Sequence, residues 1–173
     1  MKKQGFTLIE LMVVIVIMGI LAAVAVPKLF GMIAKSKASE VGPAAGTYVK
    51  LQDAYAAESN KLGTWKLIGY TAPGTKASDN EFSTTSFKYT GAATEAVDLE
   101  KDDGADIADA WKAEALVALN DCAKGKTWSI EVKGTPNAVS YEGSYSDQTN
   151  CEALTPNFTN IGTKAATTGQ GGN

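Results

Sequence analysis

The stretch FTLIELMVVIVIMGILAAVAV, residues 6–26, decides the fold of this 173-residue chain. Glu10 carries its only charged side chain. A helix rises about 1.5 Å per residue, so about 20 apolar residues cross the hydrocarbon core of a bilayer. Lys2 and Lys3 precede the stretch, and such positive charges stay on the cytoplasmic side. The sequence therefore predicts one membrane-spanning helix with a cytoplasmic amino terminus and an exported carboxyl-terminal part.

Two simpler interpretations of this stretch compete with that prediction. Ala23 and Ala25 could mimic the small-residue cleavage site of a secretory signal peptide, but such peptides have a shorter apolar core. A plain membrane anchor would leave Glu10 without a purpose. A carboxylate in hydrocarbon costs about 2.5 to 3.5 kcal/mol on insertion scales, and such residues usually have a partner. Glu10 therefore points to a function beyond anchoring.

Residues 1–27, MKKQGFTLIELMVVIVIMGILAAVAVP, resemble the class III leader and the hydrophobic helix of type IV pilins and of the related type II secretion pseudopilins. A short basic leader ends in Gly5, Phe6 follows, and Glu10 is the fifth residue from Phe6. Pro27 closes the apolar run. The resemblance implies that a prepilin peptidase cuts between Gly5 and Phe6 on the cytoplasmic side and methylates the new amine of Phe6.

Glu10 gains a partner if the leader is removed. Phe6 then carries a cationic amine, and the Glu10 carboxylate of one subunit can form a salt bridge with the Phe6 amine of its neighbour. Removing one partner of a buried ion pair typically costs about 3 to 5 kcal/mol. We therefore expect Glu10 to fix the register of an incoming subunit.

The helix is expected to continue through residues 31–62. Val41, Tyr48 and Tyr55 recur every seven residues, as on one face of an amphipathic helix. The sequence predicts one helix from Phe6 to about residue 59, with its first half in the bilayer and its second half on a globular domain.

Proline residues should bend this helix. Pro27 and Pro43, the latter after Gly42, each remove a hydrogen-bond donor and clash with the preceding turn. Kinks are therefore expected near Pro27 and near Gly42 and Pro43. The resemblance to pilins further implies that the region from Gly19 to Pro27 can unwind in an assembled filament.

Residues 63–161 are expected to form a globular head, and residues 162–173, without an apolar anchor, a flexible tail. Residues 133–137 have the composition of a hairpin turn. Three or four antiparallel strands packed on the long helix give an α+β fold, the pilin fold of the resemblance. The candidate strands are residues 85–91, 113–120, 126–132 and 138–145, of which 113–120 could also be helical.

Cys122 and Cys151 are the only cysteines, and both lie in the part expected to be exported. A disulfide in an oxidising compartment would close a loop of about 30 residues and stabilise the head by about 3 to 4 kcal/mol. Two free thiols are the alternative. In type IV pilins, the resemblance implies, the corresponding pair bounds a variable surface loop.

Composition disfavours an enzyme. Histidine is absent and all 16 basic residues are lysine, which excludes Ser-His-Asp or Cys-His catalysis, imidazole metal sites and arginine phosphate clamps. A net charge of -3 with scattered lysines also argues against nucleic acid as a partner.

The acidic residues 95–109, EAVDLEKDDGADIAD, raise the question of a calcium site, as the resemblance to major pseudopilins suggests. They lack the EF-hand spacing, and the family's ligands cannot be matched to them. A solvated acidic loop is expected instead, and no cofactor.

We therefore expect a structural protein, with leader 1–5, assembly helix 6–30, amphipathic continuation 31–62 and the head. The implied partners are other copies of the chain, a prepilin peptidase, an inner-membrane platform protein, an assembly ATPase and a secretin pore. The precursor would lie in the bacterial inner membrane and the assembled pilus outside the cell. The alternatives are a major pseudopilin in a short periplasmic pseudopilus and a monomeric membrane-anchored domain.

Overall fold

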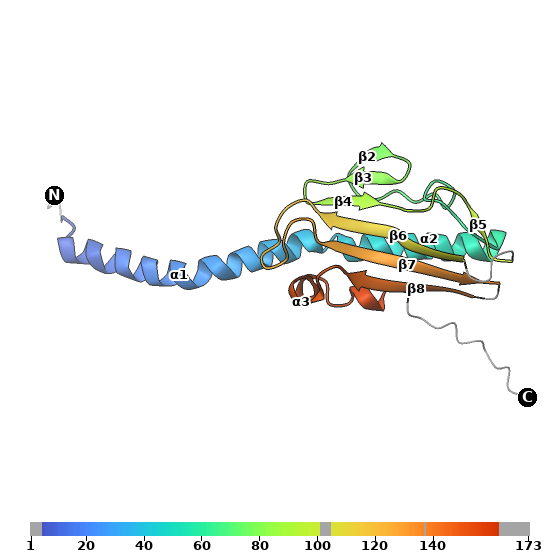
Figure 1. The fold of residues 1–173 in the computed structure, drawn as a ribbon. Coiled ribbons are helices and arrows are strands. Elements are labelled where there is room, and N and C mark those ends of the chain that lie inside the picture. Colours follow the sequence, from blue (N-terminus) through green and yellow to red (C-terminus); the bar gives the residue numbers. More distant parts are fainter. Residues whose placement is uncertain (1–4, 101–104, 137, 163–173) are drawn as a thin grey trace, which may run out of the picture.

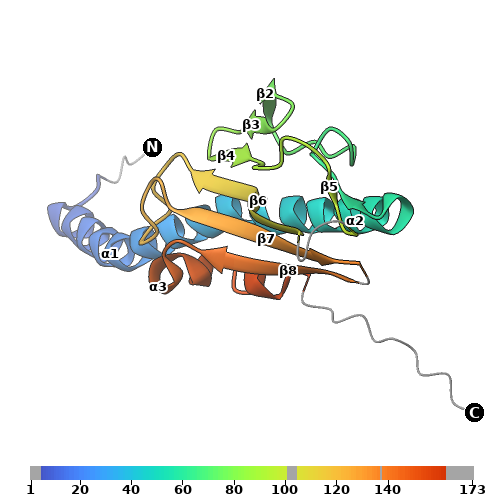
Figure 2. The ribbon, with the colours of Figure 1, turned by 45° about the vertical axis from the view of Figure 1, so that its right-hand side comes forward.

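The computed structural model describes residues 5–100, 105–136 and 138–162. Its main feature is a long helix in two segments, α1 (Leu8–Ala38) and α2 (Val41–Ser59). Figures 1 and 2 show α2 lying along one face of a sheet while most of α1 projects beyond the head. The α+β fold class predicted from the sequence is confirmed, as is the end of the helix at Ser59.

The main sheet has six antiparallel strands, two more than the larger number expected. Their spatial order is β2-β3-β4-β6-β7-β8, and a separate two-stranded sheet pairs β1 with β5. The strands are β1 (Lys61–Leu62), β2 (Thr75–Ser78), β3 (Glu81–Ser83), β4 (Phe87–Thr90), β5 (Val97–Asp98), β6 (Ala105–Ala115), β7 (Thr127–Thr135) and β8 (Ala138–Tyr145). Between β8 and residue 162, where the described part of the chain ends, lie three short helices: α3 (Gln148–Cys151), η1 (Glu152–Leu154) and η2 (Phe158–Asn160).

Three of the four candidate strands are confirmed, as β4, β7 and β8. The β7–β8 hairpin also forms as expected, with Thr135 opposite Ala138. The prediction of a strand over residues 113–120 is wrong, because β6 ends at Ala115 and the chain then turns. The acidic residues 95–109 are not simply a loop, since β5 lies among them and β6 begins at Ala105.

The interruption between α1 and α2 falls at residues 39–40, slightly before the predicted kink at Gly42 and Pro43. A proline ring clashes with the carbonyl group four residues earlier, which here is that of Ser39. Pro43 itself lies in the first turn of α2, where its missing N–H group is tolerated. Gly19 and Pro27 lie inside α1, which continues through both and is bowed (Figure 1).

The core of the head lies between α2 and the sheet. One face of α2 is buried through Val41, Ala45, Tyr48 and Gln52, at the spacing of successive helical turns. Small alanines let the helix approach the sheet, and the aromatic side chains fill the remaining volume. The largest fully buried side chains include Trp65, Trp111, Trp128, Tyr48, Tyr89, Phe87 and Phe158.

The chain after β8 returns to the helix. η2 packs against β8 at Gly143, where a side chain would not fit, since a Cβ atom there would lie 2.7 Å from the Phe158 carbonyl oxygen. η1 contacts α1. The carboxyl-terminal segment thereby covers the place where the long helix enters the head.

Candidate functional site: the N-terminal helix

The amino-terminal end of α1 is closed by a capping box between Thr7 and Glu10. The Thr7 hydroxyl group accepts a hydrogen bond from the Glu10 backbone N–H at 3.4 Å. In return, Glu10 Oε2 accepts hydrogen bonds from the Thr7 backbone N–H at 2.8 Å and from the Thr7 hydroxyl at 2.7 Å. This reciprocal arrangement gives hydrogen-bond acceptors to backbone N–H groups that have no acceptor within the helix.

Sequence reasoning missed this role of Thr7, although the signal is present. Thr-Leu-Ile-Glu, residues 7–10, has the Ser/Thr-x-x-Glu spacing of a capping box ahead of an apolar run. Glu10 therefore has a local hydrogen-bond partner, Thr7, in the single chain. The bonds neutralise no charge, so the carboxylate still lacks a counter-ion within the described part of α1.

Gly5 and Phe6 precede the helix, and the Phe6 side chain is 84% exposed. Phe6 and Glu10 line the same shallow groove, of about 360 Å³, together with Ile9, Val13 and Val14. The structure thus brings Phe6 and Glu10 to one end and one side of the helix.

The apolar side chains of α1 are exposed on every side of the helix. Every large hydrophobic residue from Leu8 to Ile33 has at least 43% of its surface exposed. The helix is long and apolar enough to cross a membrane by length and composition. Exposed apolar surface on this scale is unfavourable in water and marks a membrane or protein contact. Lipid or other helices must therefore cover α1.

A second anchor lies where α1 meets α2. Glu40 Oε1 accepts hydrogen bonds of 2.9 Å from the hydroxyl groups of Thr84 and Tyr89. Burial is the main reason why the pKa of Tyr89 is raised, with the nearby Glu40 carboxylate adding to it. These bonds attach the junction of the two helix segments to β4 and to the turn before it. No sequence motif predicts them.

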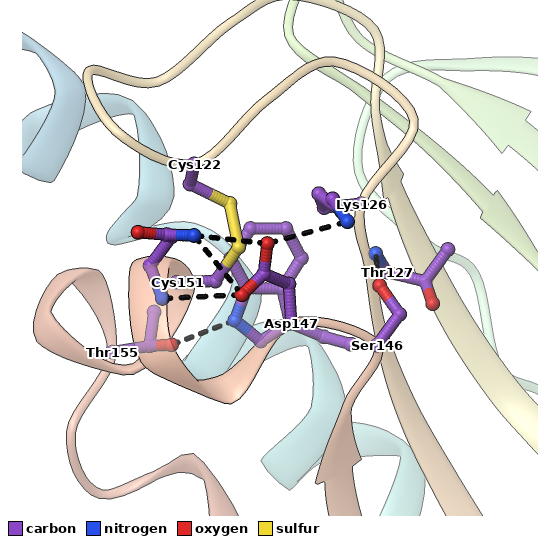
Figure 3. Close-up of a disulfide and its surroundings, with 9 residues drawn as sticks. Cys122, Lys126, Thr127, Ser146, Asp147, Cys151 and Thr155 are labelled. Atoms are coloured by element: carbon purple, nitrogen blue, oxygen red, sulfur yellow. Dashed lines mark hydrogen bonds and ion pairs between the residues drawn. A yellow bond between two sulfur atoms is a disulfide. The ribbon is translucent and has the colours of Figure 1, made fainter.

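The disulfide between Cys122 and Cys151 is present, as predicted (Figure 3). It joins the turn after β6 to α3, and both sulfur-bearing side chains are fully buried. Beside it, Asp147 accepts from the Asn150 backbone N–H at the start of α3 and forms an ion pair of 3.2 Å with Lys126. Trp128 Nε1 donates to the Thr155 hydroxyl at 2.7 Å, so the carboxyl-terminal segment is fixed on the core.

The described residues contain no group of three or more His, Cys, Asp or Glu side chains placed to hold a metal ion. Residues 101–104 of the acidic stretch lie outside the described part of the chain.

Comparison with known proteins identifies the family. Residues 1–26 match the family model of the prokaryotic N-terminal methylation motif. The chain is 32% identical over 139 residues to the type IV major fimbrial protein FimA of Dichelobacter nodosus, covering 77% of this chain and 85% of that protein. It is 35% identical over 140 residues to fimbrial protein Q of Moraxella bovis, covering 77% of this chain and 88% of that protein. The chain belongs to the type IV pilin family. Fimbrial protein EcpC of Eikenella corrodens extends the likeness, at 30% identity, to 95% of this pilin and 96% of that protein.

Membership of this family explains why α1 exposes its apolar side chains while the head buries its own. The pilin is a structural subunit of a pilus, and its helix α1 is the part that must be covered when subunits self-assemble into a filament. These relatives are named as fimbrial proteins, so the pseudopilin alternative gains no further support. They are structural proteins rather than enzymes.

Proposed function

We propose that this pilin polymerises through α1 into a surface filament after cleavage between Gly5 and Phe6 and methylation of the Phe6 amine. The observation that carries the proposal is the exposed apolar surface of α1 beside a head that has its own core. Such a helix can be stored in a bilayer and later exchange lipid for neighbouring helices, because both environments are apolar.

The position of the cleavage site supports processing. Gly5 and Phe6 lie outside α1, ahead of the N-cap residue Thr7, whose backbone is extended. A peptidase needs its substrate bond in an accessible, non-helical segment. Cleavage there would leave the helix cap intact and place the new amine, that of Phe6, four residues before Glu10.

The geometry of Glu10 supports its role in assembly. Within the described chain, both hydrogen bonds that Thr7 donates to the Glu10 carboxylate end on Oε2, so Oε1 can accept a hydrogen bond from the Phe6 amine of a neighbouring subunit. The capping box also holds the carboxylate at the end of α1 nearest Phe6. A charge-assisted bond of this kind is stronger than a neutral one, especially in a site without water.

The proposed cellular path follows from this mechanism. The precursor would lie in the bacterial inner membrane with a cytoplasmic amino terminus, where a prepilin peptidase processes it. An inner-membrane platform protein and a cytoplasmic assembly ATPase would then add subunits to the filament, and a secretin would let the filament through the outer membrane.

Substitution of Glu10 by Gln tests the charge apart from the helix cap. Glutamine can replace glutamate in a capping box, so Glu10→Gln keeps the hydrogen-bonding role and removes only the charge. Thr7→Ala is the matched control, since it removes the two hydrogen bonds of the Thr7 hydroxyl group and keeps the carboxylate. Fibres sheared from cells and the envelope fraction are compared by yield and by intact mass.

We expect wild-type fibres to contain a chain that begins at Phe6, with one added methyl group and with the Cys122–Cys151 disulfide. The Glu10→Gln chain should be processed yet remain in the envelope, whereas Thr7→Ala should still form fibres. A normal fibre yield from Glu10→Gln would refute the role of the charge. A wild-type chain that retains Met1 to Gly5 would refute processing.

A further inference from the structure

The exposed apolar surface of α1 does not stop at Pro27. Beyond it, Phe30, Met32 and Ile33 are 60%, 64% and 43% exposed. Residues 6–26 already match the hydrocarbon core of about 30 Å. The seven residues from Pro27 to Ile33 add about 10 Å of helix, enough to cross the headgroup layer on one side of a bilayer. These three side chains therefore lie at the level of the headgroups when residues 6–26 span the membrane.

The same part of α1 carries a concentration of positive charge. Lys28, Lys35 and Lys37 are exposed, and no acidic residue occurs between Glu10 and Glu40. The rest of the chain has the opposite charge. Of the 16 lysines and 19 acidic residues, 11 lysines and 18 acidic residues belong to residues 40–173, a net charge of -7. A positive segment thus separates the apolar membrane span from an acidic head.

A cleft lies where this segment meets the head. It has a volume of about 470 Å³ and lies between α1 and the turn after β6. Its walls are mostly apolar, and Lys37 and Asn120 are the polar residues that line it. The lining residues are Phe30, Ile33, Ala34, Lys37, Ala118 and Asn120. An apolar cleft with a cation at its side can accommodate the upper part of an acyl chain beside a phosphate group.

We propose that this surface, the collar formed by Lys28, Lys35, Lys37, Phe30, Met32 and Ile33, binds anionic phospholipids of the outer leaflet of the inner membrane. The inference rests on the membrane-stored stage of the proposed function. The lysines attract anionic headgroups, and the apolar side chains enter the boundary with the acyl chains. The collar thereby holds the acidic head, which anionic lipid would repel, at a fixed height above the membrane.

Three observations favour lipid over a second pilin as the partner of the collar. The collar is continuous with the membrane span, its exposed apolar side chains begin about one helical turn beyond Val26, and its charge is opposite to that of anionic headgroups. Long lysine side chains can extend along the helix to reach this layer.

Lipid selectivity of the full-length, unassembled protein tests the proposal. The protein in nonionic detergent is mixed with equal amounts of phosphatidylglycerol and phosphatidylcholine, and native mass spectrometry measures which lipid stays bound. The collar variant is Lys28→Gln/Lys35→Gln/Lys37→Gln. The control variant, Lys50→Gln/Lys61→Gln/Lys66→Gln, has the same change of charge at exposed positions on the head. Lys2 and Lys3 are common to all three proteins.

Wild type and the control variant should retain phosphatidylglycerol over phosphatidylcholine by about tenfold or more, and the collar variant should lose this preference. An unchanged preference in the collar variant would overturn the proposal, as would no preference in wild type. If the collar variant kept its lipid preference but lost fibres on cells, the lysines would face a neighbouring subunit instead. Because the measurement uses unassembled protein, a failure of the Glu10 experiment would not affect it.

Discussion

The two segments of the long helix differ in how far their apolar side chains are exposed. In α1, Ile17 is 51% exposed and Leu21 is 64% exposed, whereas Tyr48 in α2 is 1% exposed. The sheet of the head covers the apolar face of α2. The apolar side chains of α1 can be covered only by other molecules. The comparison shows that stability and assembly depend on different segments of one helix. Substitutions in the head should lower the free energy of unfolding, and substitutions in α1 should affect filament formation.

The largest expected effect comes from the core of the head. Trp111→Ala removes a fully buried ring that contacts Tyr89 and Phe158, and should lower the free energy of unfolding by about 3 to 5 kcal/mol. Ile17→Ala in α1 should leave the head unchanged to within about 0.5 kcal/mol. Urea unfolding of the detergent-solubilised protein, followed by circular dichroism, gives both values. Equal destabilisation by the two substitutions would contradict the separation.

Removal of the disulfide should have the next largest effect. The bond closes a loop with a sequence separation of 29 residues, so Cys122→Ala/Cys151→Ala should cost about 3 kcal/mol of head stability. The same urea unfolding, without reductant, measures it. A stability equal to that of wild type would show that α3 and η1 hold their place through Asp147 and Thr155 alone.

The junction between the two helix segments should contribute less. Glu40→Ala removes the acceptor of two hydrogen bonds and should cost about 1 to 3 kcal/mol. Tyr89→Phe removes one of these bonds and serves as the matched, smaller change. A double-mutant cycle between the two positions should give a coupling energy of about 1 kcal/mol, and strict additivity would mean that the bond does not stabilise the junction.

The smallest effect should be a pH dependence at Asp147. Hydrogen bonding from Asn150, followed by the ion pair with Lys126, lowers the pKa of Asp147 below its ordinary value of 3.8. A lowered pKa in the folded state stabilises the head above the unfolded value, and this stabilisation is lost as the pH falls through the folded value. The difference in unfolding midpoint between wild type and Asp147→Asn should therefore be present at neutral pH and shrink below about pH 3.8. A difference that does not depend on pH would exclude this contribution.

The helix and the hairpin were predictable because their signals are local. A long apolar run, a seven-residue repeat and a turn-forming segment each depend on neighbouring residues. β6 was missed for a physical reason: the pairing with β7 shifts register between Ile107 and Trp111, where Asp109 has a φ of 50°. The shift buries Ala110 and Trp111 in succession, so the alternation that marks a strand changes phase within the segment.

The residues of the candidate site also fall into two groups, those with a local sequence signal and those without one. Gly5, Phe6 and Glu10 stand in a short, contiguous pattern, and the roles assigned to them in processing and assembly remain predictions. The partners of Glu40 lie 44 and 49 residues away in sequence, in the β3–β4 turn and on β4, and only the fold brings them together. A single sequence contains no signal for such a contact.

The complete burial of Cys122 and Cys151 sets an order of events. A sulfur atom with no exposed surface is out of reach of both oxidases and reductants, so the bond must form while the head is still open. Oxidation therefore comes before the final packing of the head, and before any filament. Once the head has closed, thiols in the surroundings cannot reverse that step without first unfolding it, and each subunit keeps its covalent state for the lifetime of the fibre.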